Sequence, residues 1–148
     1  MSVELRPGTA LSLGERAALF TAGYEGYVVP MHVDETALGW MQEKLDFDLD
    51  ASRIAYRDGE PVGLVNLAVR DREAWIGGVG VITSARRTGV GEALMRAAHE
   101  EARARGVERV WLEVIDSNGG ARALYEKLGY ATTQDVEVWP TGMTAASS

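Results

Sequence analysis

Residues 75–106 read WIGGVGVITSARRTGVGEALMRAAHEEARARG, and the other predicted elements can be placed around them. The run starts as an apolar stretch with three glycines, typical of a strand, and ends as an Ala-rich stretch, typical of a helix that stops at Gly106. Between them lies the basic, glycine-rich turn Arg86-Arg87-Thr88-Gly89-Val90-Gly91. The order strand, turn, helix is the feature that decides the fold.

The turn predicts an anion site. Its glycines let the main chain approach a ligand closely, and the first four N–H groups of the following helix have no partner within that helix. The helix dipole favours an anion at this end, and Arg86 and Arg87 add positive charge. An alternative interpretation is a bulged strand in a tight strand–helix connection, because the Arg-x-x-Gly-x-Gly pattern alone is a weak signal.

The composition limits the class of protein. The 148 residues are enough for one domain, expected over residues 1–140 with a flexible C-terminal tail at 141–148. The absence of cysteine excludes disulfides and thiolate chemistry, and we predict no metal site. The net charge of −7 argues against nucleic acid and suits a cationic substrate. No secretory or membrane-spanning segment is recognisable, so we expect a cytoplasmic protein that does not contact a membrane.

Capping signals and periodicity predict the other elements. Ser12 with Glu15 forms a capping-box pattern, and Asp34 is a suitable N-cap for a second helix. Asp58-Gly59 predicts a hairpin turn, so three consecutive strands form an antiparallel meander. Helices are expected at 12–22, after 34, at 90–105 and at 121–128, and strands at 3–6, 53–57, 62–69, 75–82, 110–115 and 132–139.

Three blocks of sequence carry a resemblance to a known family. They are Val79–Ala85 leading into the turn Arg86–Gly91, then Trp111-Leu112-Glu113-Val114, and then Asn118 followed by Ala123–Tyr130. In this order and spacing they resemble the GNAT superfamily of N-acetyltransferases, and the resemblance covers nearly the whole chain. It implies the GNAT (acyl-CoA N-acyltransferase) fold. This fold is of the α+β class with α/β/α layers, and its mixed, mostly antiparallel sheet of six to seven strands is split between the fourth and fifth.

The chain departs from the family at its end. After Trp139 no clear seventh strand is recognisable, although members of the family usually have one. Either a partner chain completes the sheet, as in a homodimer, or the sheet ends on a short edge.

The resemblance also implies acetyl-CoA as the cofactor. Its pyrophosphate is expected on the turn, at Arg86, Arg87, Thr88, Gly89, Val90 and Gly91. Its pantetheine arm is expected to pair with the main chain of the fourth strand at Val79 and Val81, which would explain the glycines of this strand. Asn118 can cap the helix that follows it and can also bind the arm.

Two side chains are candidates for acid–base chemistry. In the family, the position of Tyr125 points at the sulfur of CoA, so Tyr125 is the expected acid. Glu113 lies mid-strand and is expected to share a face with Trp111, where burial would raise its pKa and suit it as a base. The alternatives are a tyrosine of the core and a structural glutamate. The N–H of Val79 is the expected donor to the oxyanion.

Other residues are assigned with less support. Tyr24, Tyr27, Trp40 and Asn66 could shape the acceptor pocket, although a packed core would use the aromatic ones equally well. His99 has charged neighbours along its helix, so we expect a solvated side chain.

The sequence therefore predicts an N-acetyltransferase. It would move an acetyl group from acetyl-CoA to a primary amine, of a small molecule or a protein N-terminus, by direct attack in a ternary complex. The alternative is a non-catalytic module that binds or senses acyl-CoA.

Overall fold

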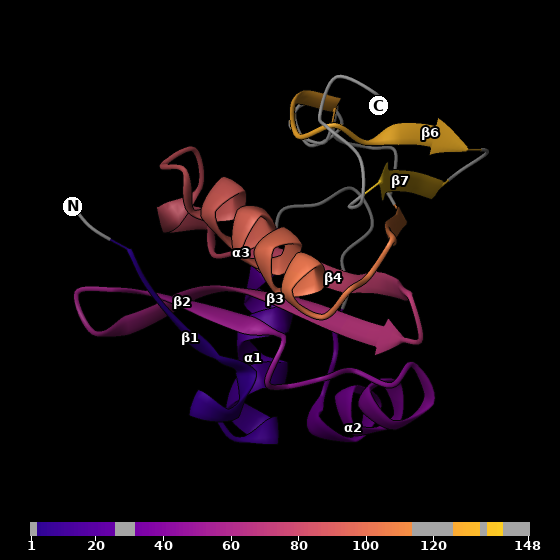
Figure 1. Cartoon of the computed structure of the whole chain (residues 1–148). Coiled ribbons are helices and arrows are strands. Elements are labelled where there is room, and N and C mark those ends of the chain that lie inside the picture. The colour runs from indigo at the N-terminus through magenta and orange to yellow at the C-terminus, as the bar shows by residue number, and fades with distance from the viewer. Residues whose placement is uncertain (1–2, 26–31, 114–125, 134–135, 141–148) are drawn as a thin grey trace.

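A seven-stranded sheet with helices on both faces forms the fold (Figure 1). The computed structural model describes residues 3–25, 32–113, 126–133 and 136–140, and for residues 113, 131–133 and 136–140 it describes the backbone alone. The helices are α1 (Leu13–Gly23), α2 (Glu35–Lys44) and α3 (Val90–Ala104), with short 3-10 turns at Gly8–Ala10 and Thr83–Ala85. The strands are β1 (Glu4–Pro7), β2 (Arg53–Arg57), β3 (Glu60–Arg70), β4 (Glu73–Val81), β5 (Arg109–Glu113), β6 (Ala131–Thr133) and β7 (Val136–Pro140).

The sheet is mixed and mostly antiparallel, as the resemblance implied. Its strand order is β1-β2-β3-β4-β5-β7-β6, and of its neighbouring pairs only β4 and β5 run parallel. The expected hairpin is present, with β2 ending at Arg57 and β3 beginning at Glu60.

The prediction of a missing seventh strand is wrong. The stretch expected to be one strand at 132–139 contains two, because Thr133 pairs with Val136 and the chain reverses between them. β7 then lies between β5 and β6. This chain therefore supplies seven strands itself, and the reason for expecting a partner's strand disappears.

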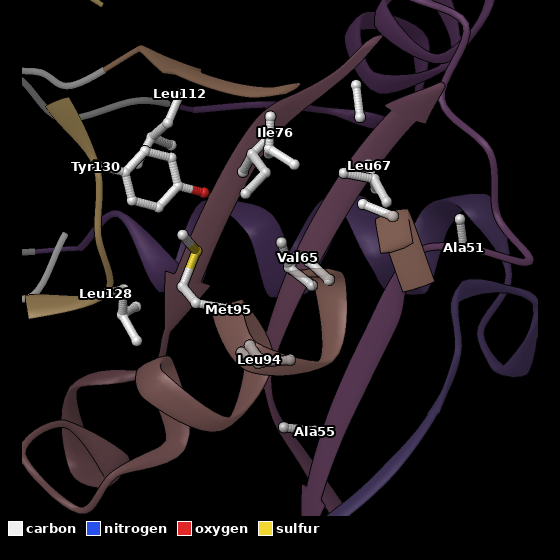
Figure 2. Packing of buried hydrophobic residues seen from close by; sticks show 14 of the residues in the cluster. Ala51, Ala55, Val65, Leu67, Ile76, Leu94, Met95, Leu112, Leu128 and Tyr130 are labelled. Atoms are coloured by element: carbon white, nitrogen blue, oxygen red, sulfur yellow. The ribbon is translucent and has the colours of Figure 1, made fainter. Parts of the chain in front are cut away.

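The two faces of the sheet are covered differently. Figure 1 shows α3 on one face and α1 and α2 on the other. α3 packs on β2, β3 and β4, while α1 packs on β3 and β4 with α2 beside it. Under α3 lies a fully buried cluster that includes Val65, Leu67, Leu94 and Met95 (Figure 2). Burying each such side chain stabilises the fold by about 1.5–3 kcal/mol.

Both helices on the other face begin at side-chain caps, as predicted. The hydroxyl of Ser12 accepts the N–H of Glu15, whose carboxylate accepts the N–H of Ser12. The carboxylate of Asp34 accepts the N–H of Ala37 at 2.8 Å. These bonds satisfy N–H groups that the helices themselves leave without partners.

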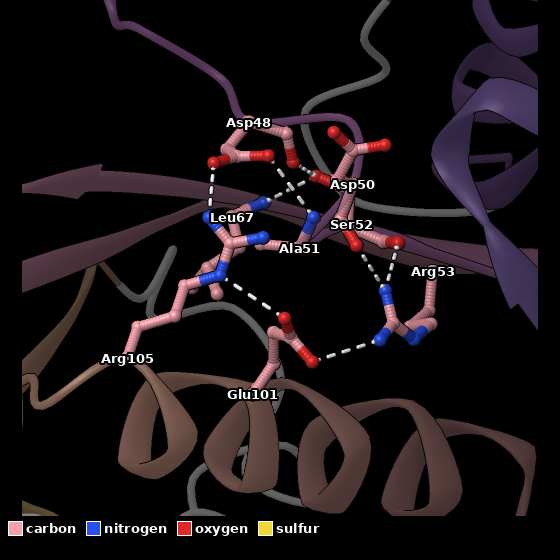
Figure 3. Close-up of polar contacts among 8 residues, drawn as sticks. All are labelled: Asp48, Asp50, Ala51, Ser52, Arg53, Leu67, Glu101 and Arg105. Atoms are coloured by element: carbon pink, nitrogen blue, oxygen red, sulfur yellow. Dashed lines mark hydrogen bonds and ion pairs between the residues drawn. The ribbon is translucent and has the colours of Figure 1, made fainter.

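A polar network joins the end of α3 to the segment before β2 (Figure 3). The carboxylate of Glu101 binds Arg53 and Arg105, each at 3.0 Å, and Arg105 also pairs with Asp48. The network fixes α3 to the sheet at the end opposite to the glycine-rich turn.

Candidate functional site

The sheet splits between β4 and β5. Only four residue pairs join these strands, from Glu73–Arg109 to Ile76–Leu112. β4 continues to Val81 and stays paired with β3 along this length. Among the described residues, none of β5 pairs with β4 beyond Ile76. The split that the resemblance implied is therefore present.

A β-bulge marks the start of the split. Gly78 pairs with Asn66 while Ile76 pairs with Leu67, so Gly77 is an extra residue on β4. A bulge bends the strand that contains it and increases its twist. The bend lies directly after the last pair with β5.

The bulge is followed by main-chain groups that face the split. The N–H of Ile82 donates to the carbonyl of Val62 on β3 at 2.9 Å. Because polar groups alternate in direction along an antiparallel strand, those of Val79 and Val81 point away from β3. The Val81 carbonyl accepts Nε of Arg86 at 2.9 Å, as this direction requires. Within the described residues, the edge of β4 that was predicted to hold a pantetheine arm thus has no neighbouring strand on the side of the split, and Arg86 binds one of its carbonyl groups.

The glycines of β4 have a packing role as well. A methyl group on Gly80 would lie 3.0 Å from the Cα of Gly23, at the end of α1. A Cβ on Gly78, where φ is 151°, would lie 2.7 Å from the ring of Phe20. α1 therefore approaches β4 so closely that side chains do not fit, and access for a ligand is not the only reason for these glycines.

The turn after β4 leaves the N-terminus of α3 uncapped by any side chain. Its N-cap is Gly89, with φ of 86° and no side-chain hydrogen bond, in contrast to Ser12 of α1 and Asp34 of α2. A methyl group on Gly89 would have no heavy atom within 4 Å. Arg87, at φ of 63°, shares this left-handed conformation and is exposed. Such a turn presents N–H groups to an anion.

The two arginines of the turn differ in role. The guanidinium of Arg86 donates to the carbonyl of Val81 and, also at 2.9 Å, to that of Gly23. It therefore ties the turn to β4 and to the end of α1. The exposed Arg87 carries the more accessible positive charge.

The predicted catalytic residues lie at the limit of the described chain. Glu113 is the last residue of β5 and stands opposite Val136 of β7, directly after the last pair with β4. Asn118 and Tyr125 lie outside the described residues. Their roles stay predictions.

The prediction of a solvated His99 is wrong. Its side chain is buried, and its Nε2 lies 2.6 Å from the hydroxyl of Tyr130. Burial, with the charges of Arg103 and Arg96, lowers the pKa of His99 to about 4. The buried positions of α3 include Met95 and Ala102, four before and three after His99. That helical spacing was a signal for burial that the charged neighbours masked.

The structure also brings together two indoles that sequence reasoning did not pair. Trp75 of β4 and Trp111 of β5 stand opposite each other, stacked with ring centroids 5.7 Å apart and an interplanar angle of 15°. Nε1 of Trp111 donates to the carboxylate of Glu73 at 3.2 Å. Trp75 remains 42% exposed. The sequence signal for this contact was the presence of one tryptophan on each of the two strands that pair in parallel.

The residues expected around the acceptor differ in burial and do not line one pocket together in the described part of the chain. Asn66 is buried at the bulge, and its Nδ2 has no hydrogen-bond partner in the described part of the chain. Tyr24 stacks on Phe20, while Trp40 on α2 is exposed. A pocket of about 820 Å³ lies beside α1 and the segment before α2, and its lining includes Tyr24, Glu25, His32 and Asp34.

Two kinds of site are not found in the described ranges. No three His, Asp or Glu residues there are grouped so as to hold a metal ion. None of the helices in the same ranges has the length and apolar character needed to cross a bilayer.

Comparison with known proteins identifies one family. The model of the acetyltransferase (GNAT) family matches residues 18–130. The ribosomal-protein-S18-alanine N-acetyltransferase of Escherichia coli is 43% identical over 58 residues, which are 39% of this chain and 39% of that protein. The mycothiol acetyltransferase of Saccharomonospora viridis is 31% identical over 86% of this chain and 49% of its own length. The matched segments thus span half or less of these curated relatives.

A solved structure matches over a greater length. The crystal structure of the ribosomal-protein-S18-alanine N-acetyltransferase from Escherichia coli superposes with a TM-score of 0.77 at 24% identity. The match covers 97% of this chain and 96% of that one. The two chains therefore share one fold over nearly their whole lengths.

Proposed function

Because the chain belongs to the acetyltransferase (GNAT) family, we propose that it is an N-acetyltransferase that moves an acetyl group from acetyl-CoA to a primary amine by direct attack in a ternary complex. One observation carries the proposal: the glycine-capped start of α3 follows directly on the open edge of β4. A phosphate site and a strand edge thus lie in sequence along one face of the split. This order suits a long ligand with an anionic end.

The residues present suit the cofactor. Bound acetyl-CoA supplies the acetyl group as a thioester. The uncapped N–H groups at Gly89–Gly91 would hold its pyrophosphate, with Arg87 adding charge. The main-chain groups of Val79 and the N–H of Val81, whose carbonyl is bound by Arg86, would pair with the arm, and Asn118 would add a contact from the segment after β5.

The chain must also manage the proton of the amine. An alkylamine with a pKa near 10.4 costs about 4.6 kcal/mol to deprotonate at pH 7, whereas an α-amine with a pKa near 8 costs only about 1.4 kcal/mol. Glu113, placed directly after the last β4–β5 pair, is the proposed base. A carboxylate base suits an α-amine better than an alkylamine, because the α-amine needs less free energy to lose its proton.

Two further groups complete the proposed chemistry. The N–H of Val79, on the open edge of β4, would donate to the oxyanion that develops on the acetyl group. Tyr125 would give its phenolic proton to the departing thiolate, since a tyrosine with a pKa near 10 can serve as an acid at neutral pH.

We propose the N-terminal α-amine of a protein as the acceptor. The support is the relative with 43% identity over 58 residues, which is an alanine N-acetyltransferase of a ribosomal protein. A small-molecule amine is the second candidate, and it is favoured by the relative named a mycothiol acetyltransferase.

Release of free CoA tests the proposal. The purified chain is incubated with acetyl-CoA and either peptides with a free N-terminus, the same peptides with a blocked N-terminus, or a library of small amines. We expect CoA release only with a free amine, and an acetyl group on that amine by mass spectrometry. Tyr125→Phe should lose turnover and still bind CoA, while Tyr56→Phe, on β2, serves as the control. Binding of CoA without release for any amine would leave the non-catalytic module as the function.

A further inference from the structure

The stacked indoles of Trp75 and Trp111 form an uncovered aromatic platform. Trp75 pairs with Ala68, which belongs to the buried cluster of the α1 and α2 face, so the platform is on that face. α1 covers the other end of β4, at Gly78 and Gly80. Trp75 remains 42% exposed although its indole is stacked on one side.

The platform lies directly before the split. Trp75–Trp111 is the last pair but one between β4 and β5, and only Ile76–Leu112 follows. Glu113, the proposed base, is two positions after Trp111 in β5, which corresponds to about 7 Å along a strand. A group bound on the platform is therefore within two or three residues of an amine that reacts at the split.

The carboxylate of Glu73 lies beside the platform and can attract a cation, and it also offsets the charge of the neighbouring Arg109. The carboxylate of Glu73 binds the indole N–H of Trp111 and forms no ion pair within the described part of the chain. Two neighbouring guanidinium groups are already neutralised, because Arg72 binds Glu108 and Arg70 binds Asp46. Arg109, opposite Glu73 in the ladder, is exposed and makes no ion pair with it.

We infer that this platform, defined by Trp75, Trp111 and Glu73, binds a basic side chain of the acceptor polypeptide a few residues after the acetylated amine. The inference rests on the proposed transfer to a protein N-terminus. A planar guanidinium stacks on an indole and gains from the ring quadrupole, and the nearby carboxylate adds attraction. The enzyme thereby selects N-termini that carry arginine early in the chain.

A peptide series tests this directly. The peptides have one length, an N-terminal alanine and no other charged side chain. They carry arginine, citrulline or alanine at the second, third or fourth position, and kcat/KM is measured for each. Citrulline has nearly the shape of arginine without the charge. At one of these positions we expect arginine to exceed citrulline about fivefold, which corresponds to a cation–π contact of roughly 1 kcal/mol.

Variants assign the preference to the platform. Trp75→Ala should bring the arginine-to-citrulline ratio close to one, while Trp75→Phe keeps part of it because a phenyl ring still attracts a cation. Glu73→Gln should lower the ratio without abolishing it, since the amide still accepts the indole N–H. Glu100→Gln, an exposed side chain on α3 and thus on the other face of the sheet, should leave the ratio as it is.

Three results would overturn the inference. Equal kcat/KM for arginine and citrulline at every position excludes a cation site. An unchanged ratio in Trp75→Ala moves the site elsewhere, and a higher kcat/KM for citrulline or alanine than for arginine means that the platform binds an uncharged group. Absence of turnover with any peptide contradicts the proposed function itself. Thermal unfolding of each variant confirms that it is folded.

Discussion

Nε2 of His99 lies 2.6 Å from the phenolic oxygen of Tyr130, inside the core. His99 is on α3, and Tyr130 directly precedes β6. Both side chains are at least 95% buried. The contact therefore joins the helix that starts at the glycine-rich turn to the C-terminal part of the sheet, and its burial favours an uncharged imidazole.

Stability should depend on pH through His99. Its pKa is about 4 in the folded protein and about 6.5 in the unfolded chain, so between these values the unfolded state binds more protons. The stability that the fold gains by keeping His99 uncharged is fully present above about pH 6.5 and is lost as the pH falls towards 4. From pH 7 to pH 5 we expect a loss of about 2 kcal/mol in the free energy of unfolding from this group.

A matched variant isolates this effect from the carboxylates. His99→Gln keeps a polar partner for Tyr130 but does not titrate. Urea unfolding of both proteins at pH 7, 6 and 5 gives the difference in free energy of unfolding. That difference should change by about 2 kcal/mol in favour of the variant as the pH falls to 5. A difference that stays constant over this range would mean that His99 does not charge on unfolding.

Arg16 should lower the stability of the fold. Its side chain is 4% exposed, its Nη2 binds Gln42 at 2.7 Å, and its Nε and Nη1 have no partner within the described ranges. Burial lowers its pKa. Arg16→Met removes the buried charge and keeps the volume, so we expect the free energy of unfolding to rise by about 1 kcal/mol or more. Arg16→Lys keeps the charge and should not stabilise. A clear loss in Arg16→Met would show that the guanidinium is well solvated or paired.

Local signals predicted most of the first half of the fold. The caps at Ser12 and Asp34, and the turn at Asp58-Gly59, are each fixed by residues within four positions of one another. Such contacts can be recognised in a sequence because both partners are adjacent in it. The family and its split sheet followed from motifs of the same local kind.

Contacts between distant segments were the ones that sequence reasoning missed. His99 is buried by Tyr130, which comes from another element, so its charged neighbours on α3 gave the wrong indication. The sequence predicts one strand where β6 and β7 reverse, because residues 132–139 alternate and contain no glycine or proline to mark a turn. The stacking of Trp75 on Trp111 depends on the parallel register of β4 and β5.

The candidate site was predicted in part. The turn at Arg86–Gly91 and the edge at Val79 and Val81 are present, and their contacts with CoA stay predictions, while Arg86 braces the turn against β4 and α1. No pattern in the sequence distinguishes such a brace from a ligand contact, because the carbonyl groups that accept its bonds are common to all residues.

The network around Glu101 should contribute measurably to stability. Its carboxylate bridges Arg53 and Arg105 and is only 24% exposed (Figure 3). Glu101→Gln removes the charge and leaves two guanidinium groups facing each other, so we expect a loss of about 1–2 kcal/mol in urea unfolding, less at high salt. Glu100→Gln, its exposed neighbour on α3, should change stability by less than about 0.5 kcal/mol. Equal effects of the two substitutions would mean that the network stabilises nothing.

Substitutions at two glycines, one at each end of α3, can distinguish an effect on cofactor binding from the cost of backbone strain. Gly89 and Gly106 both have left-handed φ values, 86° and 75°, and a methyl group on either would have no heavy atom within 4 Å. An alanine at either position should therefore cost a similar free energy of unfolding, about 1–2 kcal/mol. The two sites flank a helix that is about 22 Å long, from its fifteen residues.

Only one of the two substitutions should affect CoA. In Gly89→Ala the methyl group and the strained turn disturb the N–H groups proposed to hold the pyrophosphate, so calorimetry with CoA should show at least about tenfold weaker binding, the loss of a charge-assisted hydrogen bond. Gly106→Ala should bind CoA as the parent protein does, because the cofactor does not reach that end of α3. If both variants bind CoA with the parent's affinity, the pyrophosphate does not lie on this turn, and the open edge of β4 loses its proposed ligand as well.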